Sequence, residues 1–200
     1  MLSDFDGQRD GTNAFIFSRY LVPYLCNFEG YALFLDGDMV CTRDIAELMQ
    51  ETGKAVEVVH HDYKTKFSRK YIGSSLENSN IDYPRKNWSS VILWNCGHQD
   101  NKVLTPEFVT SSTGQYLHRF SWLQDNQIGE LPSDWNYLVG EFPPGPASIY
   151  HYTLGVPGLR YYADTHASWN WHKTLLTALV CAKESPSEMV KRAEDRIGAI

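Results

Sequence analysis

The amino-acid sequence predicts an α/β fold in a single domain that covers residues 1–200. Short apolar runs typical of strands alternate with segments of helical periodicity. In addition, 42% of the residues are hydrophobic and 14% are aromatic, which is enough for one sizeable core. The sequence contains no internal repeat, low-complexity tract or linker-like stretch that would divide it into two domains.

The first part of the chain predicts helix, strand, helix and strand in that order. Apolar residues recur at helical intervals over residues 12–28, and Pro23 should kink or shorten this helix. The apolar run Tyr31–Leu35 then predicts a buried strand. Residues 43–50 predict a short helix, and residues 55–60 predict a second buried strand.

A long polar segment, residues 61–86, interrupts this alternation. It is polar and contains several serines and asparagines together with Gly73 and Pro84, so we expect a surface loop, and long loops of this kind often bind ligands or cover sites. Its basic residues are expected to be solvated; they are Lys64, Lys66, Arg69 and Lys70. The elements predicted beyond the loop are a strand at 91–94, a helix capped at 105–107, a strand at 147–152, and helices at 167–183 and 187–197.

Composition narrows the class of protein. The net charge of −6 and the pI near 5.6 argue against generic binding to nucleic acid or to acidic membranes. The four cysteines, Cys26, Cys41, Cys96 and Cys181, lack the paired spacing of zinc or redox sites. The sequence has no signal-like N-terminal region and no apolar stretch of membrane-spanning length. We therefore expect a cytoplasmic protein with reduced thiols, no membrane span and no nucleic-acid partner.

Asp36-Gly37-Asp38 directly follows the strand predicted at Tyr31–Leu35. Two carboxylates at the carboxyl end of a strand form an oxygen-rich site for a divalent cation, at the edge where open α/β sheets bind their ligands. The triplet therefore predicts metal-assisted chemistry on a phosphorylated substrate. The structural alternative is a solvated turn in which Gly37 supplies a permissive backbone.

Four segments, taken in order, resemble one protein family. They are FSRYLVP (17–23), ALFLDGD (32–38), NWSSVILWN (87–95), and LPSDWN (131–136) followed by HYTLG (151–155). Their order and spacing are similar to those of the retaining glycosyltransferases of family eight and their bacterial and phage relatives, which have the GT-A fold. The resemblance implies a mixed sheet flanked by helices. It also implies an enzyme that moves a sugar from a nucleoside-diphosphate sugar, with UDP as the expected nucleotide, to a glycan or other acceptor that the sequence does not specify.

The resemblance further implies a metal site and a donor site. Carried over by position, Asp36, Asp38 and His151 would hold Mn²⁺ or Mg²⁺, and the imidazole favours Mn²⁺. The cation would bridge the diphosphate of the donor. The donor-binding residues implied besides the two aspartates are Arg19, Gly37, Ser90 and Gly155. The alternatives are a surface ion pair for Arg19 and a hydrogen-bonded strand end for His151.

Two more pairs of residues are assigned through the resemblance. Asp125 and Asn126 stand where relatives carry an Asp-Gln pair, so they are the catalytic candidates that would orient an oxocarbenium-like transition state. The structural alternative, which the loose match favours, is an exposed turn between a helix and a loop. Trp135 and Asn136 are the candidates for an acceptor site, because aromatic faces stack on sugar rings, whereas tryptophan more commonly lies in a core.

The chain departs from the family pattern at two places. Relatives begin with a strand and a helix that bind the base and the ribose, whereas residues 1–11 read as a polar stub. This difference implies a fragment, a partner chain or oligomer that completes the sheet, or a loss of donor binding. Many relatives also carry a lysine that follows the histidine and contacts the donor phosphate, whereas this chain has Val156-Pro157-Gly158.

Two other functions compete with this interpretation. A haloacid-dehalogenase-like phosphatase would use Asp36 as the nucleophile and Asp38 as the acid and base. It would also need an acidic pair further along the chain, and the sequence shows no convincing pair at a strand end after residue 60. A non-catalytic GT-A-like module would bind a sugar or a partner without turnover, so binding of a nucleotide sugar without transfer would identify it.

Overall fold

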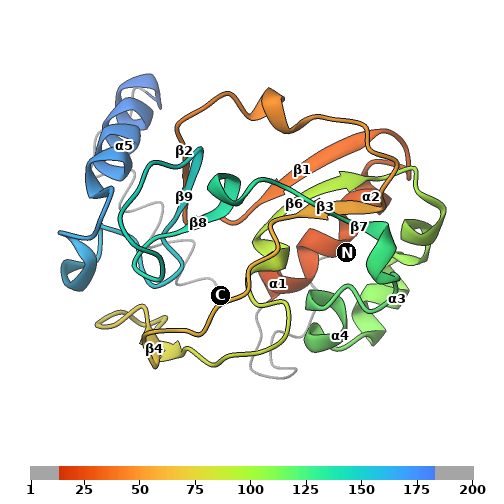
Figure 1. The fold of residues 1–200 in the computed structure, drawn as a ribbon, viewed down its shortest axis with the longest axis horizontal. Helices are drawn as coiled ribbons and strands as arrows, with labels where there is room; N and C mark the ends of the chain where they lie inside the picture. Colours follow the sequence, from red (N-terminus) through yellow and green to blue (C-terminus); the bar gives the residue numbers. More distant parts are fainter. Residues whose placement is uncertain (1–13, 183–200) are drawn as a thin grey trace.

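The structure, a computed structural model, describes residues 14–182, and the segments predicted at 1–11 and 187–197 lie outside this range. Two mixed sheets flanked by helices confirm the predicted α/β class (Figure 1). The strands are β1 (Tyr31–Leu35), β2 (Met39–Cys41), β3 (Val56–Val58), β4 (Arg69–Lys70), β5 (Asn78–Ser79), β6 (Val91–Asn95), β7 (Ile128–Glu130), β8 (Tyr137–Leu138) and β9 (Ile149–His151). The α-helices are α1 (Ala14–Ser18), α2 (Val22–Leu25), α3 (Pro106–Ser111), α4 (Gly114–His118) and α5 (Ser168–Ala182). The 3₁₀ turns are η3 (Arg19–Leu21), η4 (Ile45–Leu48), η5 (Trp88–Ser90), η6 (Gln99–Val103), η7 (Asp125–Gln127), η8 (Ser133–Asn136) and η9 (Arg160–Tyr162).

Residues 14–25 form three short helical elements instead of the single helix predicted over 12–28. α1 passes directly into η3 and then into α2, and Pro23 lies in the first turn of α2. Proline is tolerated there because the first N–H groups of a helix have no intrahelical partner. Asn27 and Phe28 then adopt left-handed backbone conformations, with φ of 53° and 55°, and the chain turns toward β1.

The larger sheet has the strand order β1-β6-β3-β7. β1 is antiparallel to β6, with Tyr31 opposite Asn95 and Leu35 opposite Val91. β3 is also antiparallel to β6, whereas β7 is parallel to β3. β1 lies at the edge of this sheet among the described strands, so its five residues are half-buried and not fully buried as predicted.

Side chains of β1 alternate between two cores, as the pleat of a strand requires. Ala32 and Phe34 pack against the core that α1, η3, α3 and α4 cover, and Figure 1 shows these helices gathered on one side of the larger sheet. Leu33 and Leu35 pack against a second core on the other face, which also contains Ile149 of β9. The second core therefore lies between the two sheets.

The smaller sheet has the order β2-β9-β8, in which β2 is antiparallel and β8 is parallel to β9. Residues 36–38 lead from the end of β1 in the larger sheet to the start of β2 in the smaller one. The predicted acidic turn is thus the connection between the two sheets.

Other predicted elements are present in shorter form. Residues 43–50 contain only η4, whose first turn is capped by the side chain of Asp44. Residues 61–86 contain only the two-residue strands β4 and β5, as expected for a loop. Thr105 caps α3 as predicted, and α5 matches the helix predicted over 167–183.

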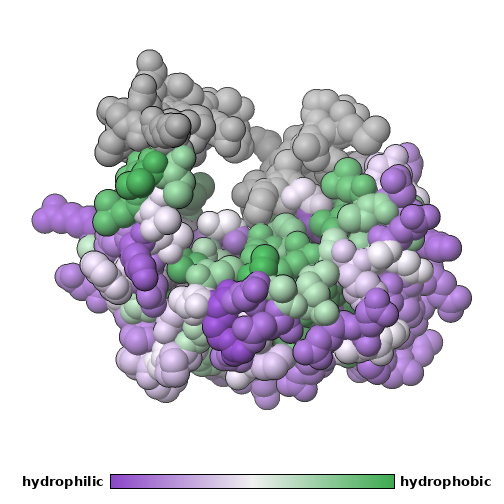
Figure 2. Space-filling model, turned by 90° about the horizontal axis from the view of Figure 1, so that it is seen from above, coloured by the Kyte–Doolittle hydropathy of each residue, from purple (hydrophilic) through white to green (hydrophobic). Residues whose placement is uncertain are grey.

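The outer surface of α5 is partly apolar. Trp169, Leu176 and Val180 are exposed, and the green area at the upper left of Figure 2 lies over this helix.

None of the helices within residues 14–182 is both long and apolar enough to span a bilayer.

Candidate metal centre

Asp36, Asp38 and His151 converge at the turn that joins the two sheets. Each offers one ligand atom, and these three atoms lie within 4.8 Å of one another. Strand pairing brings them together, because Asp36 directly follows β1 and because Met39, the residue after Asp38, lies opposite His151 across β2 and β9. The backbone N–H of Tyr152 also donates to the Asp38 carbonyl at 2.9 Å. The three metal ligands predicted from the sequence therefore meet in space.

A buried chain of hydrogen bonds fixes the imidazole of His151. Its Nδ1 lies 2.9 Å from Asn136 Oδ1, and Asn136 Nδ2 donates to Ser90 Oγ at 2.9 Å and to the Asn87 carbonyl at 3.1 Å. Because the amide nitrogen already has two acceptors, the amide oxygen accepts, and the network assigns the proton to His151 Nδ1. Nε2, which lies 3.3 Å from Asp38 Oδ1, is then the nitrogen that can ligate a cation.

We expect Asn136→Ala to weaken divalent cation binding about 10- to 100-fold, because a ligating histidine depends on the partner that orients its ring. Isothermal titration calorimetry with Mn²⁺ measures this loss. Asn126→Ala, which removes an exposed side chain on η7, is the matched control and should bind Mn²⁺ like the wild type. Equal Mn²⁺ affinities for Asn136→Ala and the wild type would contradict the role given to this network.

Asp38 is held in its ionised form by its neighbours. Tyr71 Oη donates to Asp38 Oδ2 at 2.9 Å. Burial opposes the negative charge, but the nearby His151 and the hydrogen bond from Tyr71 outweigh it, so the pKa of Asp38 lies below its ordinary value of 3.8. The carboxylate form required of a metal ligand is therefore present at neutral pH.

Arg19 holds Asp36 from the opposite side. Arg19 Nη2 donates to Asp36 Oδ1 at 2.8 Å, and Nη1 donates to the Ser89 carbonyl at 2.7 Å. The side chains of Arg19 and Asp36 are 6% and 17% exposed, so this is a buried ion pair and not the surface pair considered above. Burial raises the pKa of Asp36 above 3.8, and the charge of Arg19 partly offsets that effect. Nη1 also donates to Asp36 Oδ2 at the longer distance of 3.5 Å, so a cation would share this carboxylate with Arg19.

The structure does not bring Asp125 and Asn126 to this cluster. The Asn126 carbonyl accepts a hydrogen bond from Lys54 Nζ at 2.9 Å, and η7 directly precedes β7, so both residues lie by the beginning of β3. β1 and β3 run in the same direction because both are antiparallel to β6, and Asp36 follows the end of β1. The pair therefore lies at the opposite edge of the sheet, where Asp125 forms an ion pair with Arg85 at 2.5 Å. This position gives no support to their predicted role at the reacting sugar.

The two residues predicted for the acceptor site lie inside the protein. Trp135 is 4% exposed and packs in the core between the sheets, with the Arg43 guanidinium 5.4 Å from its ring centre. Asn136 is fully buried and orients His151. Neither side chain presents a free face to a sugar, so their structural roles are packing and positioning.

The absence of a side chain at Gly155 allows the ring of Tyr162 to pack close to its backbone. The φ of Gly155 is 153°, and a Cβ at this position would lie 2.3 Å from Tyr162 Cε2. Tyr162 Oη in turn accepts a hydrogen bond from the N–H of Ile72 at 3.1 Å, which ties residues 61–86 to the chain that follows β9. Gly37 differs, because a Cβ there would meet no atom within 4 Å. Direct contacts of either glycine with a donor stay predictions.

We expect Gly155→Ala to lower the free energy of unfolding by about 1–3 kcal/mol, because the added methyl group would displace the ring of Tyr162. Gly37→Ala is the control and should stay within about 0.5 kcal/mol of the wild type, because its surroundings are open. Urea unfolding of the two variants measures the difference. A fully stable Gly155→Ala protein would mean that Tyr162 packs differently.

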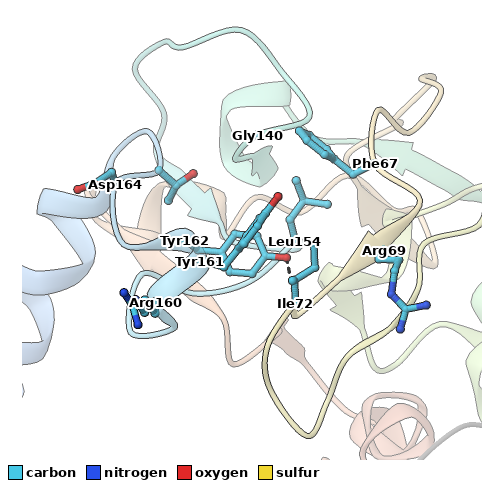
Figure 3. A pocket seen from close by; sticks show the side chains of 10 residues that line it. Phe67, Arg69, Ile72, Gly140, Leu154, Arg160, Tyr161, Tyr162 and Asp164 are labelled. Atoms are coloured by element: carbon cyan, nitrogen blue, oxygen red, sulfur yellow. Dashed lines mark hydrogen bonds between the residues drawn. The ribbon is translucent and has the colours of Figure 1, made fainter.

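A pocket of about 290 Å³ lies between residues 61–86 and the chain that follows β9 (Figure 3). Phe67 and Tyr161 line it with aromatic rings that are 43% and 64% exposed, and Ile72 and Leu154 add apolar contacts. Ile72 follows the tyrosine that binds Asp38, although Asp36, Asp38 and His151 themselves do not line the pocket. Aromatic faces next to polar groups suit the apolar face of a sugar ring.

Two residues of the centre are missed or misassigned by sequence reasoning. Tyr71, which binds Asp38, lies in a segment without strand or helix periodicity, and the only signal for it is the length of the loop 61–86. Asn136 is part of the resemblance, but its role as the partner of His151 depends on the pairing of β8 with β9, which the pattern does not predict.

Comparisons with known proteins give limited similarity. Protein CDI of Arabidopsis thaliana is 40% identical over 173 residues, which are 82% of this chain and 65% of that protein. This chain thus spans slightly less than two thirds of that relative's length. Among solved structures, the apo-form glycosyltransferase GlyE of Streptococcus pneumoniae TIGR4 is 17% identical with a TM-score of 0.49, over 80% of this chain and 42% of GlyE. No protein-family model matches the chain.

Proposed function

We propose that this chain is a metal-dependent glycosyltransferase domain of the GT-A type that takes a sugar from a UDP-sugar. The observation that carries the proposal is the convergence of Asp36, Asp38 and His151, whose ligand atoms lie within 4.8 Å of one another. These are the ligands that the sequence resemblance implies, and the two carboxylates lie on the turn between the sheets while the imidazole lies on β9 of the smaller sheet. An accidental acidic surface would not have a buried histidine with its ring orientation fixed.

The three ligand atoms of the centre fit Mn²⁺ better than Mg²⁺, because two carboxylates suit either cation and one imidazole shifts the preference toward Mn²⁺. When bound, the cation would neutralise the diphosphate leaving group as its bond to the sugar breaks. The residues of the chain hold the ligands in place: Arg19 binds Asp36, Tyr71 binds Asp38 and Asn136 binds His151. We place the acceptor sugar in the pocket that Tyr161 and Phe67 line.

The phosphatase alternative is less compatible with this geometry. A nucleophilic Asp36 would need free oxygens, whereas the buried guanidinium of Arg19 lies 2.8 Å from Asp36 Oδ1 and 3.5 Å from Oδ2. The third member of the cluster is His151, and among the described residues no downstream acidic pair joins it. Glycosyl transfer needs no protein nucleophile at this position.

Thermal-shift titration with UDP-glucose, UDP-galactose and UDP, each with Mn²⁺ and with EDTA, tests the proposal. A ligand that binds the native state raises the melting temperature, so a rise that requires Mn²⁺ is expected. Release of UDP from the effective donor then distinguishes an enzyme from a module that only binds. No shift with any of the nucleotides in the presence of Mn²⁺ would contradict the proposed function.

A further inference from the structure

Lys70 differs from the other cations of its segment. Lys64, Lys66 and Arg69 are exposed, as expected for a solvated loop, whereas Lys70 is half-buried. Its ammonium has no hydrogen bond or ion pair with any residue in the range 14–182, and Nζ lies 5.5 Å from the centre of the Tyr71 ring. Lys70 is therefore a partly desolvated positive charge without a hydrogen-bonding partner in the described chain.

The position of Lys70 is beside the metal cluster. Tyr71, the next residue, donates its hydroxyl to Asp38 at 2.9 Å. Burial lowers the pKa of Lys70, while the negative charges of Asp38 and then Asp36 act on it in the opposite direction. The ammonium thus lies within electrostatic reach of both carboxylates, although it binds neither.

A buried carboxylate fixes the segment that carries Lys70. Glu141 is 2% exposed and accepts hydrogen bonds from Thr65 Oγ1 at 2.5 Å, from the N–H of Lys66 at 2.9 Å and from Asn80 Nδ2 at 3.2 Å. These bonds hold both ends of the segment around β4. The position of Lys70 is therefore set by the fold and does not depend on the flexibility of a free loop.

The balance of charges around the centre favours binding of an anion. With a divalent cation bound, its two positive charges would balance Asp36 and Asp38, and Lys70 would remain as a half-buried positive charge beside them. A buried charge without a counterion is unfavourable. The diphosphate group of a nucleotide sugar is negatively charged, so it would supply a counterion for Lys70.

We propose that Lys70 is a phosphate-binding residue of this centre and contacts the diphosphate of the donor. The inference rests on the proposed function, since it names the group that the same site would bind. A lysine ammonium is a compact charge with three donors, well suited to phosphate oxygens. Residues 61–86 would then supply both Tyr71 for the metal ligand and Lys70 for the substrate.

The test compares Lys70→Met with Lys64→Met, which removes an exposed cation of the same segment. Calorimetry measures the affinity of each protein for Mn²⁺ alone and, in the presence of Mn²⁺, for UDP, inorganic pyrophosphate and uridine. Lys70→Met should weaken UDP and pyrophosphate about 10- to 100-fold, as expected for loss of a hydrogen bond to a charged group. Binding of Mn²⁺ alone and of uridine should be unchanged, and Lys64→Met should match the wild type throughout.

The outcomes distinguish failure of the role proposed for Lys70 from failure of the proposed function. If Lys70→Met binds UDP and pyrophosphate like the wild type, Lys70 is not a phosphate-binding residue, while the proposed function stands on the wild-type affinity. If it loses Mn²⁺ to the same extent as UDP, its effect is on the centre as a whole and the inference fails. If the wild type binds pyrophosphate with Mn²⁺ but not UDP, the role of Lys70 survives and the nucleotide-sugar function fails.

Discussion

Replacement of Asp38 by asparagine should abolish measurable Mn²⁺ binding and leave the fold intact. Asn retains the shape of the side chain and one oxygen for Tyr71, so the hydrogen bond of 2.9 Å has an acceptor. It removes the negative charge that a cation requires of this ligand. Since loss of an outer-shell partner already costs about 10- to 100-fold in metal affinity, loss of a ligand should exceed that range.

For Asp38→Asn, titration with Mn²⁺ measures the loss of metal binding, and urea unfolding measures any loss of stability. The matched control is Asp62→Asn, which removes an exposed carboxylate outside the cluster and should change neither quantity. Wild-type Mn²⁺ affinity in Asp38→Asn would overturn the metal assignment. A large loss of stability, well beyond the roughly 1–3 kcal/mol of a disrupted buried hydrogen bond, would instead give Asp38 a primarily structural role.

Arg19→Met should destabilise the protein by about 3–5 kcal/mol, which is the typical effect of leaving one member of a buried ion pair without its partner. Arg19 is 6% exposed at its side chain and binds both Asp36 and the Ser89 carbonyl. Met fills a similar volume without the charge. Chemical unfolding of the purified variant measures the loss, with Arg43→Met as the control, because the Arg43 side chain is 51% exposed.

A double-mutant cycle isolates the Arg19 and Asp36 pair from the other contacts of Arg19. In the background of Asp36→Asn the carboxylate charge is absent, so Arg19→Met should cost clearly less than in the wild type. An equal cost in both backgrounds would show that the guanidinium stabilises the protein through its other contacts. The same four proteins also report whether Asp36 needs Arg19 to bind Mn²⁺.

The strands and the convergence of Asp36 and Asp38 at the candidate metal centre could be predicted from the sequence because their signals are local. The apolar run of β1 and the triplet that follows it need no knowledge of the rest of the chain. His151 was found through the resemblance, at a strand end that the apolar pattern also predicted within 147–152. The prediction that β1 is fully buried was less accurate, since β1 lies at a sheet edge and is only half-buried.

Residues whose role depends on long-range pairing were not predictable in the same way. β2 and β8 have three and two residues, too short for a periodic pattern, and they are strands only because β9 pairs with both. The position of Asp125 and Asn126 was not predictable for a related reason. A local match to the family motif does not say at which edge of the sheet the segment will lie, and the pairing of β7 with β3 decides that.

The attachment of residues 61–86 to Glu141 has a consequence for the order of events during synthesis. A growing chain leaves the ribosome from its N-terminus, so Thr65 and Lys66 are available long before their carboxylate partner, which lies 76 and 75 positions further on. His151 emerges later still. A nascent chain that stops before residue 141 would therefore lack the anchor for Lys70, and neither cation nor phosphate should stabilise it until the last strand of the smaller sheet has been made.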